Sequence, residues 1–407
     1  CTGSFFLSKY LTARAGICTG GRLFVEIGSE KPAHNTLSVL TFYFTGLSYF
    51  LKKSNDLLNP LPKLSFQTRQ HSHFNHQHLS IHNQLRRLRA TWYPDEFHGW
   101  GRTRRYFEGW YFKVISPDEQ HALAFIPGIS MGEKGERHAF VQVMDGKACR
   151  AQYHRFSADD FQPASHRFEV LVGKNHFSKE KISLDLPGIS GEIRFQNPIP
   201  WPKMLGAPGI MGWYSFVPFM ECFHGIVSLH HTLEGELALN NSTPQQLNIN
   251  FSGGRGYIEK DWGRSFPRAY VWVQTNHFDT HDRASLMASV AHIPWLGSYF
   301  IGFISGFWLD GRLFKFATYT GARKSLKITG EHVELIFKNP KTELRILAKQ
   351  AVGTALVSPI SGEMTGKIQE SLQATMQVEL LENGRRIFEG TGRNAGLEGA
   401  GEIDLLV

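Results

Sequence analysis

The amino-acid sequence predicts an all-β protein. Short apolar or alternating runs follow one another through most of the chain, and an apolar–polar alternation of period two is typical of a half-buried strand. Asp-Gly at 145–146 and 310–311 and Asn-Gly at 383–384 stand between such runs and favour the tight turns of β-hairpins. No long stretch has a helical apolar period with capping residues, so only 84–92 and 157–161 are expected as short helices.

Each expected strand rests on its own apolar or alternating run. In chain order these runs lie at 121–129, 138–144, 167–173, 225–235, 269–278, 298–309, 312–321, 332–339 and 376–384. Their number exceeds what one eight-stranded barrel needs. Two barrels or sandwiches packed together therefore fit the length of 407 residues better.

Three parts are expected along the chain: an N-terminal extension (1–92), a first β-barrel domain (93–255) and a second β-barrel domain (256–407). The extension contains 11 basic and three acidic residues, which is the whole net charge of +8. Because the remainder is neutral, the body is not expected to bind nucleic acid. The extension ends in a histidine-rich tract (70–84) whose polar composition predicts disorder outside the working fold, with metal chelation as the alternative.

The apolar segments and the cysteines bear on the location of the protein. No stretch reaches the roughly 18 apolar residues that span a bilayer, and the run at 37–51 has the length of a signal-peptide core without a convincing cleavage site. The four cysteines form no CxxC pair, so Cys149 and Cys222 are expected as free thiols in a reducing compartment. A cytoplasmic location is therefore expected.

Standard catalytic and metal-binding motifs are absent from the sequence. There is no GxSxG, P-loop or HExxH, and no GxGxxG that opens a helix. His230 and His231 are neighbours on one expected strand and point to opposite faces, while His277 and His281 lack a zinc-site spacing. We therefore expect no resident metal ion.

The stretch GGRGYIEKDWGRSFP (253–267) crowds acids and aromatic residues between glycines and a Phe-Pro. In a strand, Tyr257, Glu259 and Asp261 share one face, and the intervening residues face the other way. A carboxyl in an apolar, aromatic-lined pocket has a raised pKa and can donate a proton near neutrality. Aromatic ring faces can then stabilise the carbocation formed when an alkene is protonated.

A structural role is the alternative for the same acids. Glu259 and Asp261 could form a salt-bridge cluster with Arg255, Lys260 or Arg264 that locks a corner of a barrel, since structural networks also perturb carboxyl groups. The local residues favour neither interpretation over the other.

Four separated motifs resemble the tocopherol cyclase family, which is distantly related to carotenoid hydratases and includes bacterial members. They are FEGWYFK (107–113), GWYSFVPFMEC (212–222), GRGYIEKDWGRSFP (254–267) and WVQTNHF (272–278). The resemblance runs from about Tyr93 to the C-terminus. It implies two lipocalin-like antiparallel β-barrels side by side, and the cyclisation of a prenylated quinol to a chromanol without a cofactor.

The resemblance also implies roles for individual residues. The related hydratases protonate with a Tyr-x-acid pair on a strand, and the aligned pair here is Tyr257 and Glu259, with Glu in place of the hydratases' Asp. Glu259 is therefore the first candidate proton donor and Asp261 the second. His230 or His231, one strand upstream, is the expected orienting partner.

Substrate contacts are expected from the aromatic and polar residues of the same motifs. These residues are Glu108, Trp110, Trp213, Tyr214, Trp262, Trp272 and Asn276. Core packing is the alternative for the tryptophans, and for Trp262 it is favoured because this residue faces away from Glu259. An inward-facing Glu108 needs a cationic partner, which we expect to be Arg255, Arg264 or Lys260.

The expected function is that of a cofactor-free cyclase that takes an apolar prenylquinol from a membrane surface. Aromatic residues make up 13% of the chain, and a barrel lumen that holds a large apolar ligand would account for them better than packing alone. A lipocalin-like carrier without catalysis and a carotenoid hydratase-like enzyme are the alternatives. A protein at a membrane surface, plastidic in a photosynthetic eukaryote, would fit the same chemistry.

Overall fold

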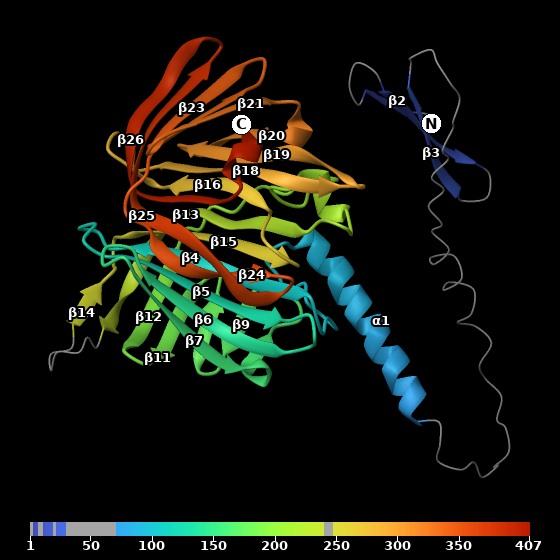
Figure 1. The fold of residues 1–407 in the computed structure, drawn as a ribbon, viewed down its shortest axis with the longest axis horizontal. Coiled ribbons are helices and arrows are strands. Elements are labelled where there is room, and N and C mark those ends of the chain that lie inside the picture. The colour runs from blue at the N-terminus through green and yellow to red at the C-terminus, as the bar shows by residue number, and fades with distance from the viewer. Residues whose placement is uncertain (1–2, 7–10, 19–21, 30–70, 240–246) are drawn as a thin grey trace. The chain divides into compact units, whose positions relative to one another are not determined.

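A computed structural model describes residues 3–6, 11–18, 22–29, 71–239 and 247–407 of the chain (Figure 1). The chain divides into two compact units, 1–69 and 70–407. In the first unit, β1 (Gly3–Phe6), β2 (Leu11–Cys18) and β3 (Arg22–Ser29) form a three-stranded antiparallel sheet. The apolar run at 37–51 lies outside the described residues. Among the described residues, no helix is long and apolar enough to cross a membrane.

Helix α1 (His71–Trp92) is longer than the helix expected at 84–92 and includes most of the histidine-rich tract. Its last turns are attached to the body of the second unit. Ala90 is fully buried, and the Arg89 guanidinium donates to both carboxyl oxygens of Glu96 at 2.9 and 2.7 Å. Arg87 Nε donates to the carbonyl oxygen of Trp100.

The first large sheet has 12 strands and is antiparallel throughout. Its path is β7-β6-β5-β4-β15-β13-β12-β11-β10-β9-β8, with β14 paired to β13. Its strands are β4 (Tyr106–Ile115), β5 (Ala122–Met131), β6 (Arg137–Asp145), β7 (Arg150–Ser157), β8 (Phe161–Pro163), β9 (Glu169–Val172), β10 (Asn175–Ser178), β11 (Lys181–Leu186), β12 (Ile189–Gln196), β13 (Cys222–Leu239), β14 (Leu247–Asn250) and β15 (Arg255–Gly263).

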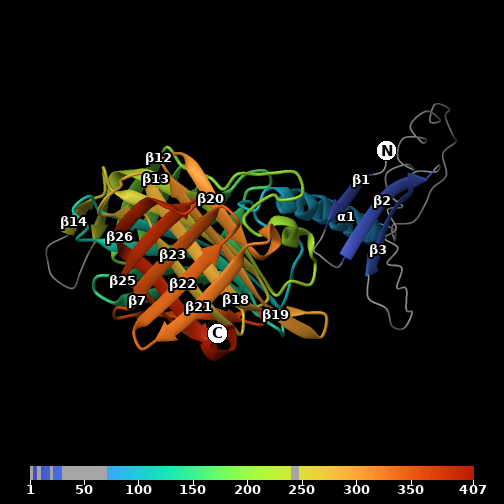
Figure 2. The ribbon, with the colours of Figure 1, turned by 90° about the horizontal axis from the view of Figure 1, so that it is seen from above.

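The second large sheet has 11 strands and is also antiparallel; Figure 2 looks onto it. Its path is β20-β19-β18-β16-β26-β25-β23-β22-β21, with β17 paired to β26 and β24 to β25. Its strands are β16 (Ala269–Thr275), β17 (His277–Phe278), β18 (Ala284–Trp295), β19 (Ser298–Leu309), β20 (Arg312–Ala317), β21 (Arg323–Thr329), β22 (His332–Lys338), β23 (Thr342–Lys349), β24 (Thr354–Ile360), β25 (Glu363–Glu382) and β26 (Arg385–Gly401).

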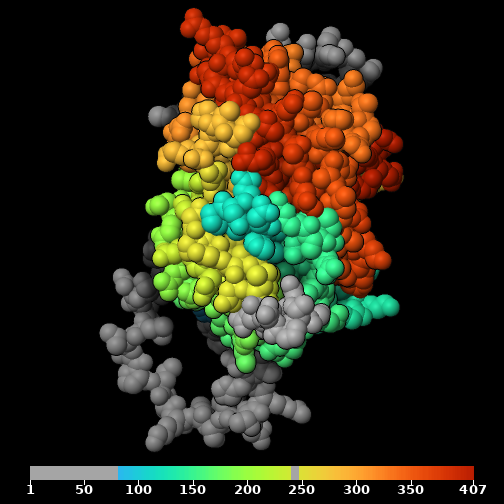
Figure 3. All heavy atoms as spheres, turned by 90° about the vertical axis from the view of Figure 1, so that its left-hand side faces the viewer, coloured from blue at the N-terminus to red at the C-terminus, as the bar shows by residue number. Residues whose placement is uncertain are grey.

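The all-β prediction and the prediction of two β-barrels are confirmed, because each large sheet encloses its own apolar core. The expected domain boundary at 255/256 stays a prediction. In the structure, β15 pairs with β4 and β13 of the first sheet, and the chain passes to the second sheet between Gly263 and Ala269. Figure 3 shows the orange and red residues of the C-terminal part of the chain packed directly against green and yellow residues that precede them.

The turns follow the backbone preferences of their residues, with one exception. Asp310-Gly311 and Asn383-Gly384 both have positive φ at each residue, as a type I′ hairpin turn requires. Asp145-Gly146 is not such a turn, so this expectation was wrong. Asp145 Oδ1 accepts hydrogen bonds from the backbone of Lys147 and Ala148, which stabilises a longer loop.

A short helix is present at the second expected position. It is a 3₁₀ helix, η1 (Ala158–Asp160), rather than the segment 157–161, and Ser157 caps it by accepting from the backbone of Asp159. The described part of the chain also contains the 3₁₀ turns η2 (Gly212–Phe216), η3 (Thr318–Thr320) and η4 (Ile403–Leu406).

A third apolar cluster joins the two large sheets. It combines Tyr111 and Tyr257 of the first sheet with Tyr270, Trp272 and Trp308 of the second, all of them at most 8% exposed. The two sheets therefore share a buried aromatic layer in addition to their separate cores, and the candidate site lies in this layer.

Candidate active site

The two faces of β15 enter different parts of the protein. Tyr257 is fully buried in the layer between the sheets, whereas Ile258 and Trp262 belong to the core of the first sheet. The expected alternation is therefore observed. The expectation of a site in a barrel lumen was wrong, because the face that carries Tyr257, Glu259 and Asp261 points between the sheets, where Glu259 and Asp261 line a pocket.

The pocket between the sheets has a volume of about 190 Å³. Its lining is mostly apolar, yet it contains the carboxyl groups of Glu259, Asp261, Glu370 and Glu398. The first two come from β15, whereas Glu370 lies on β25 and Glu398 on β26, so acids converge from both sheets. Aromatic lining residues include Tyr111, Tyr214, Phe266, Tyr270, Trp272 and Phe300.

Glu259 is buried and accepts hydrogen bonds from two aromatic side chains. The Tyr257 hydroxyl donates to Glu259 Oε2 at 2.5 Å, and Trp272 Nε1 donates to the same oxygen at 3.2 Å. Burial raises the pKa of Glu259 to about 7, although the positive charge of His224 opposes the rise. Burial also raises the pKa of Tyr257 well above its ordinary value, so the phenol stays a donor. Glu259 can therefore hold and release a proton near neutrality.

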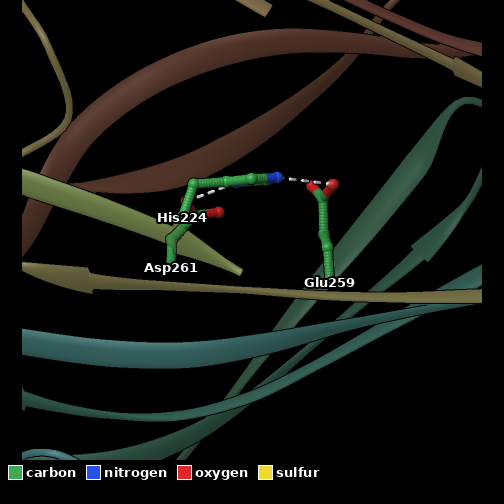
Figure 4. Close-up of side chains that lie close together, drawn as sticks. All are labelled: His224, Glu259 and Asp261. Carbon is green, nitrogen blue, oxygen red and sulfur yellow. Dashed lines mark hydrogen bonds and ion pairs between the residues drawn. The ribbon is translucent and has the colours of Figure 1, made fainter. Parts of the chain in front are cut away.

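His224 links the two acids of β15 (Figure 4). Its Nδ1 lies 2.9 Å from Asp261 Oδ1, and its Nε2 lies 3.5 Å from Glu259 Oε2. Burial alone would lower the pKa of His224, but Asp261 and Glu259 together raise it to about 9. His224 is therefore a cation at neutral pH, held between two carboxyl groups.

Two further tyrosine–glutamate pairs line the pocket. The Tyr111 hydroxyl donates to Glu370 Oε1 at 2.5 Å, and the Tyr270 hydroxyl donates to Glu398 Oε1. Burial raises the pKa of Glu370 to about 7 and that of Glu398 well above its ordinary range. The sequence analysis missed Glu370 and Glu398. They are single acids on unremarkable strands, and no motif marks them.

His230 and His231 do not contact Glu259, so the expected orienting partner was wrong. His231 Nδ1 lies 2.9 Å from Ser228 Oγ and its ring packs on Phe195, while His230 stacks on Trp308. Burial lowers the pKa of His231 to about 3 and that of His230 to about 4, so both are neutral. The histidine beside Glu259 is His224, which precedes the expected run at 225–235 by one residue and belongs to the same strand, because β13 begins at Cys222.

The register of β13 on β15 explains this error. At one end His231 is opposite Gly256, and uninterrupted pairing would place His230 opposite Tyr257. Two irregularities shift the register, between Ser228 and His231 and between Ile226 and Ser228. As a result, His224 lies opposite Asp261.

Glu108 does not line the pocket but forms a buried ion pair in the first sheet. Lys260 Nζ lies 2.5 Å from Glu108 Oε1, and both side chains are fully buried. The ammonium group also lies 4.7 Å from the ring centroids of both Trp110 and Trp262. The expected cationic partner of Glu108 is confirmed, and of the three candidates it is Lys260. Trp110 and Trp262 lie in the core of the first sheet instead of the pocket.

Two other expected substrate contacts also lie outside the pocket lining. Trp213 is 45% exposed and stacks on Tyr214, with ring centroids 4.1 Å apart. Asn276 is buried and donates to the carbonyl oxygen of Gly256 at 2.8 Å. Of the aromatic residues expected at the substrate, Tyr214 and Trp272 do line the pocket.

The residues around His224 also have the donor types of a metal site. His224, Glu259 and Asp261 each offer a ligand atom, and these atoms lie within 4.8 Å of one another. A protonated His224 is not a ligand, since metal binding needs the neutral imidazole. Because the two carboxyl groups raise the pKa of His224, binding of a cation by these three residues would release the imidazole proton.

Comparison with known proteins gives the family. The tocopherol cyclase-like family model matches residues 189–401, from β12 to the end of β26; the motif at 107–113 lies outside this range. A probable chloroplastic tocopherol cyclase of Oryza sativa subsp. japonica is 24% identical over 207 residues, 47% of this chain and 42% of that protein. The chloroplastic tocopherol cyclase of Zea mays is 23% identical over 207 residues, 47% of this chain and 41% of that protein. The chain thus matches less than half the length of these relatives.

A solved structure of CghA aligns with 73% of this chain and 88% of its own, at 10% identity and a TM-score of 0.49. The family match covers more than half of the chain and both the β15 acids and the acids of the second sheet. The chain belongs to the tocopherol cyclase-like family.

Proposed function

We propose that this protein is a cyclase that protonates the prenyl alkene of a prenylated quinol, so that the phenol oxygen closes a chromanol ring. The observation that carries the proposal is Glu259, a buried acid with a pKa near 7 in an apolar, aromatic pocket. Near-neutral pKa values suit a general acid at physiological pH. The name of the family and of its two plant relatives supports the same chemistry.

In the proposed reaction, Glu259 donates its proton to the less substituted alkene carbon. The tertiary cation that forms lies among the ring faces of the pocket, and aromatic faces stabilise cations. The phenol oxygen then bonds to the cationic carbon and loses its own proton. The apolar lining limits access of water, which would otherwise capture the cation.

His224 and Asp261 are proposed to position and tune Glu259. The imidazolium lies between the two carboxyl groups and limits the rise of the Glu259 pKa. Trp272 and Tyr257 fix one carboxyl oxygen by donating to it, which leaves the other oxygen to carry the transferred proton. Such fixed orientation lowers the entropic barrier of the step.

The test is incubation of the full chain with a panel of reduced prenylquinones, followed by mass spectrometry. A chromanol of unchanged mass is expected, and Glu259→Gln should lower its formation by about 10²- to 10⁴-fold. Glu234→Gln, an exposed acid on β13, is the matched control. Product that gains one water would support the hydratase alternative. Tight binding of the quinols without any product would support the carrier alternative and overturn the proposal.

The proposed substrate is apolar, and the exposed aromatic residues near the pocket support its delivery from a lipid surface. Trp213 is 45% and Phe219 50% exposed, and both rings contact Trp295. Aromatic residues of this kind anchor proteins at the membrane interface. We propose a location at the periphery of a membrane. Co-sedimentation with phosphatidylcholine vesicles should be strong for the wild type and lost in Trp213→Ser/Phe219→Ser; equal sedimentation of both would contradict this docking.

The metal alternative has its own test. Because the proposed chemistry uses only side-chain acids, dialysis against a chelator should leave chromanol formation unchanged. Loss of activity on dialysis with recovery on adding Zn²⁺ would assign His224, Glu259 and Asp261 to a metal site instead.

A further inference from the structure

We propose that Glu370, held by Tyr111, accepts the proton that the quinol hydroxyl loses during ring closure. This inference rests on the proposed cyclase function. Cyclisation leaves the mass unchanged, so one proton enters at the alkene carbon and one leaves the phenol oxygen. The first proton has a donor in Glu259, and the second needs an acceptor in the same water-poor pocket.

The positions of the two carboxyl groups fit this division of roles. Glu259 and Glu370 line the same pocket from different sheets. Tyr111 connects them, because it lies directly opposite Glu259 in the β4–β15 pair and donates its hydroxyl hydrogen to Glu370 Oε1 at 2.5 Å. Among the described residues, no other side chain or backbone group bonds to the Glu370 carboxyl, so Oε2 is available as an acceptor.

A buried lysine distinguishes Glu370 from the other acids of the pocket. Lys113 shares a face of β4 with Tyr111, is 1% exposed, and donates to Gln274 Oε1 at 2.7 Å and to the carbonyl oxygen of Asn394 at 2.6 Å. Burial lowers the pKa of Lys113 to about 7, and the protonated ammonium group stabilises the ionised form of Glu370. Within the part of the chain that the structure describes, no comparable cation offsets the rise that burial causes in the pKa of Glu398, and Asp261 is already paired with His224.

The two carboxyl groups are also coupled in the direction that the reaction needs. Burial raises the pKa of Glu370, and a negative charge on Glu259 raises it further. When Glu259 gives its proton to the alkene it becomes negative, and this makes Glu370 a stronger base. The acceptor therefore gains proton affinity during the step that makes the phenol oxygen acidic.

The step balances without another reactant. The O–H bond of Glu259 breaks and a C–H bond forms at the alkene. A lone pair of the phenol oxygen forms the C–O bond to the tertiary carbon, and the phenol O–H bond breaks with its proton passing to the Glu370 carboxylate. Transfer of one proton from Glu370 back to Glu259 restores the starting state.

The test separates donor from acceptor by running the reaction in D₂O with a prenylquinol that the wild type cyclises. Glu370→Gln should lower chromanol formation about 100-fold while deuterium still enters recovered quinol, or a tertiary alcohol, through reversible protonation. Glu259→Gln should abolish both chromanol and deuterium incorporation. Glu379→Gln, a partly exposed acid on the same strand β25, is the matched control and should behave as the wild type.

Three results would overturn the inference. They are wild-type chromanol formation by Glu370→Gln, loss of deuterium incorporation equal to that of Glu259→Gln, and no rate loss in Tyr111→Phe. Tyr111→Phe keeps the Glu370 carboxyl and removes its hydrogen bond, so it tests the pair even where Glu370→Gln folds poorly; a loss of about 10-fold is expected. If the wild type forms no chromanol from any quinol, the cyclase function itself fails, which is a different outcome.

Discussion

His224 lies directly opposite Asp261 in the β13–β15 pair, and its Nδ1 is 2.9 Å from Asp261 Oδ1. This contact places a cationic imidazole beside the proposed proton donor. Asp261→Asn removes the charge that contributes most to the raised pKa of His224, so this pKa should fall from about 9 toward its ordinary value. NMR titration of the His224 ring measures the change. An unchanged pKa of His224 in this variant would show that the negative charge of Asp261 does not cause the raised pKa.

The rate of chromanol formation should depend on pH as a narrow bell centred near 7. Glu259 must be protonated, so activity falls as pH rises through its pKa of about 7. Glu370 must be ionised, so activity falls as pH decreases through its pKa, also about 7. The two limbs report values of the coupled pair. A profile of kcat/KM between pH 5 and 9 checks this, and a flat alkaline limb would contradict a carboxylic acid as donor.

Glu370 should also make the stability of the fold depend on pH. Its folded pKa of about 7 exceeds the ordinary value of 4.5, so the folded state binds the proton more tightly than the unfolded state. Stability is therefore lost as pH rises from about 4.5 to 7. Glu370→Gln removes this loss. Between pH 4.5 and pH 8, the free energy of unfolding of the variant should therefore rise relative to that of the wild type by on the order of 3 kcal/mol. Urea unfolding at both pH values gives the difference.

The buried pair of Glu108 and Lys260 should be costly to break from either side. Lys260→Met leaves a buried carboxylate and Glu108→Gln a buried ammonium, and each should destabilise the fold by about 3–5 kcal/mol. The double variant should lose much less than the sum, because no unpaired charge remains. Denaturant unfolding of the three variants completes the cycle. Additive losses would show that the pair is not coupled.

Gly396 on β26 leaves room for the indole that donates to Glu259. A Cβ at this position would lie 2.4 Å from Cζ3 of Trp272, so Gly396→Ala should displace the ring. Glu259 would lose a donor that lowers its pKa, and we expect about a 10-fold lower rate and an alkaline limb shifted upward. Gly399→Ala, on the same strand, is the control, because a Cβ added there would lie 4.0 Å from its nearest neighbouring atom, Cγ2 of Ile403. Equal rates for the two variants would exclude a role for the indole position.

The fold and half of the site could be predicted from the sequence for clear physical reasons. Side-chain alternation in a strand has a fixed period, so the shared face of Tyr257, Glu259 and Asp261 followed from counting. A buried carboxylate likewise needs a cationic partner, so the sequence predicted a cation beside Glu108, and Lys260 is the one of the three expected candidates that pairs with it.

The remaining site residues depend on register and on packing between sheets, which a sequence does not display. His224 reaches Asp261 only because two irregularities shift β13 along β15. Glu370 and Glu398 are opposite each other in the β25–β26 pair and join the β15 acids only when the second sheet packs on the first. No spacing along the chain encodes that convergence.

The acids of the pocket are divided between two sheets, and this division lets evolution alter them separately. A change on β25 can remove the proposed base, Glu370, and leave the proposed acid of β15, Glu259, intact. In the proposed mechanism, a cation formed without a base for the phenol either loses its new proton again or is captured by water. Whether the ring closes or water adds then depends on a residue of the second sheet. A single substitution in that sheet would therefore convert one reaction into the other.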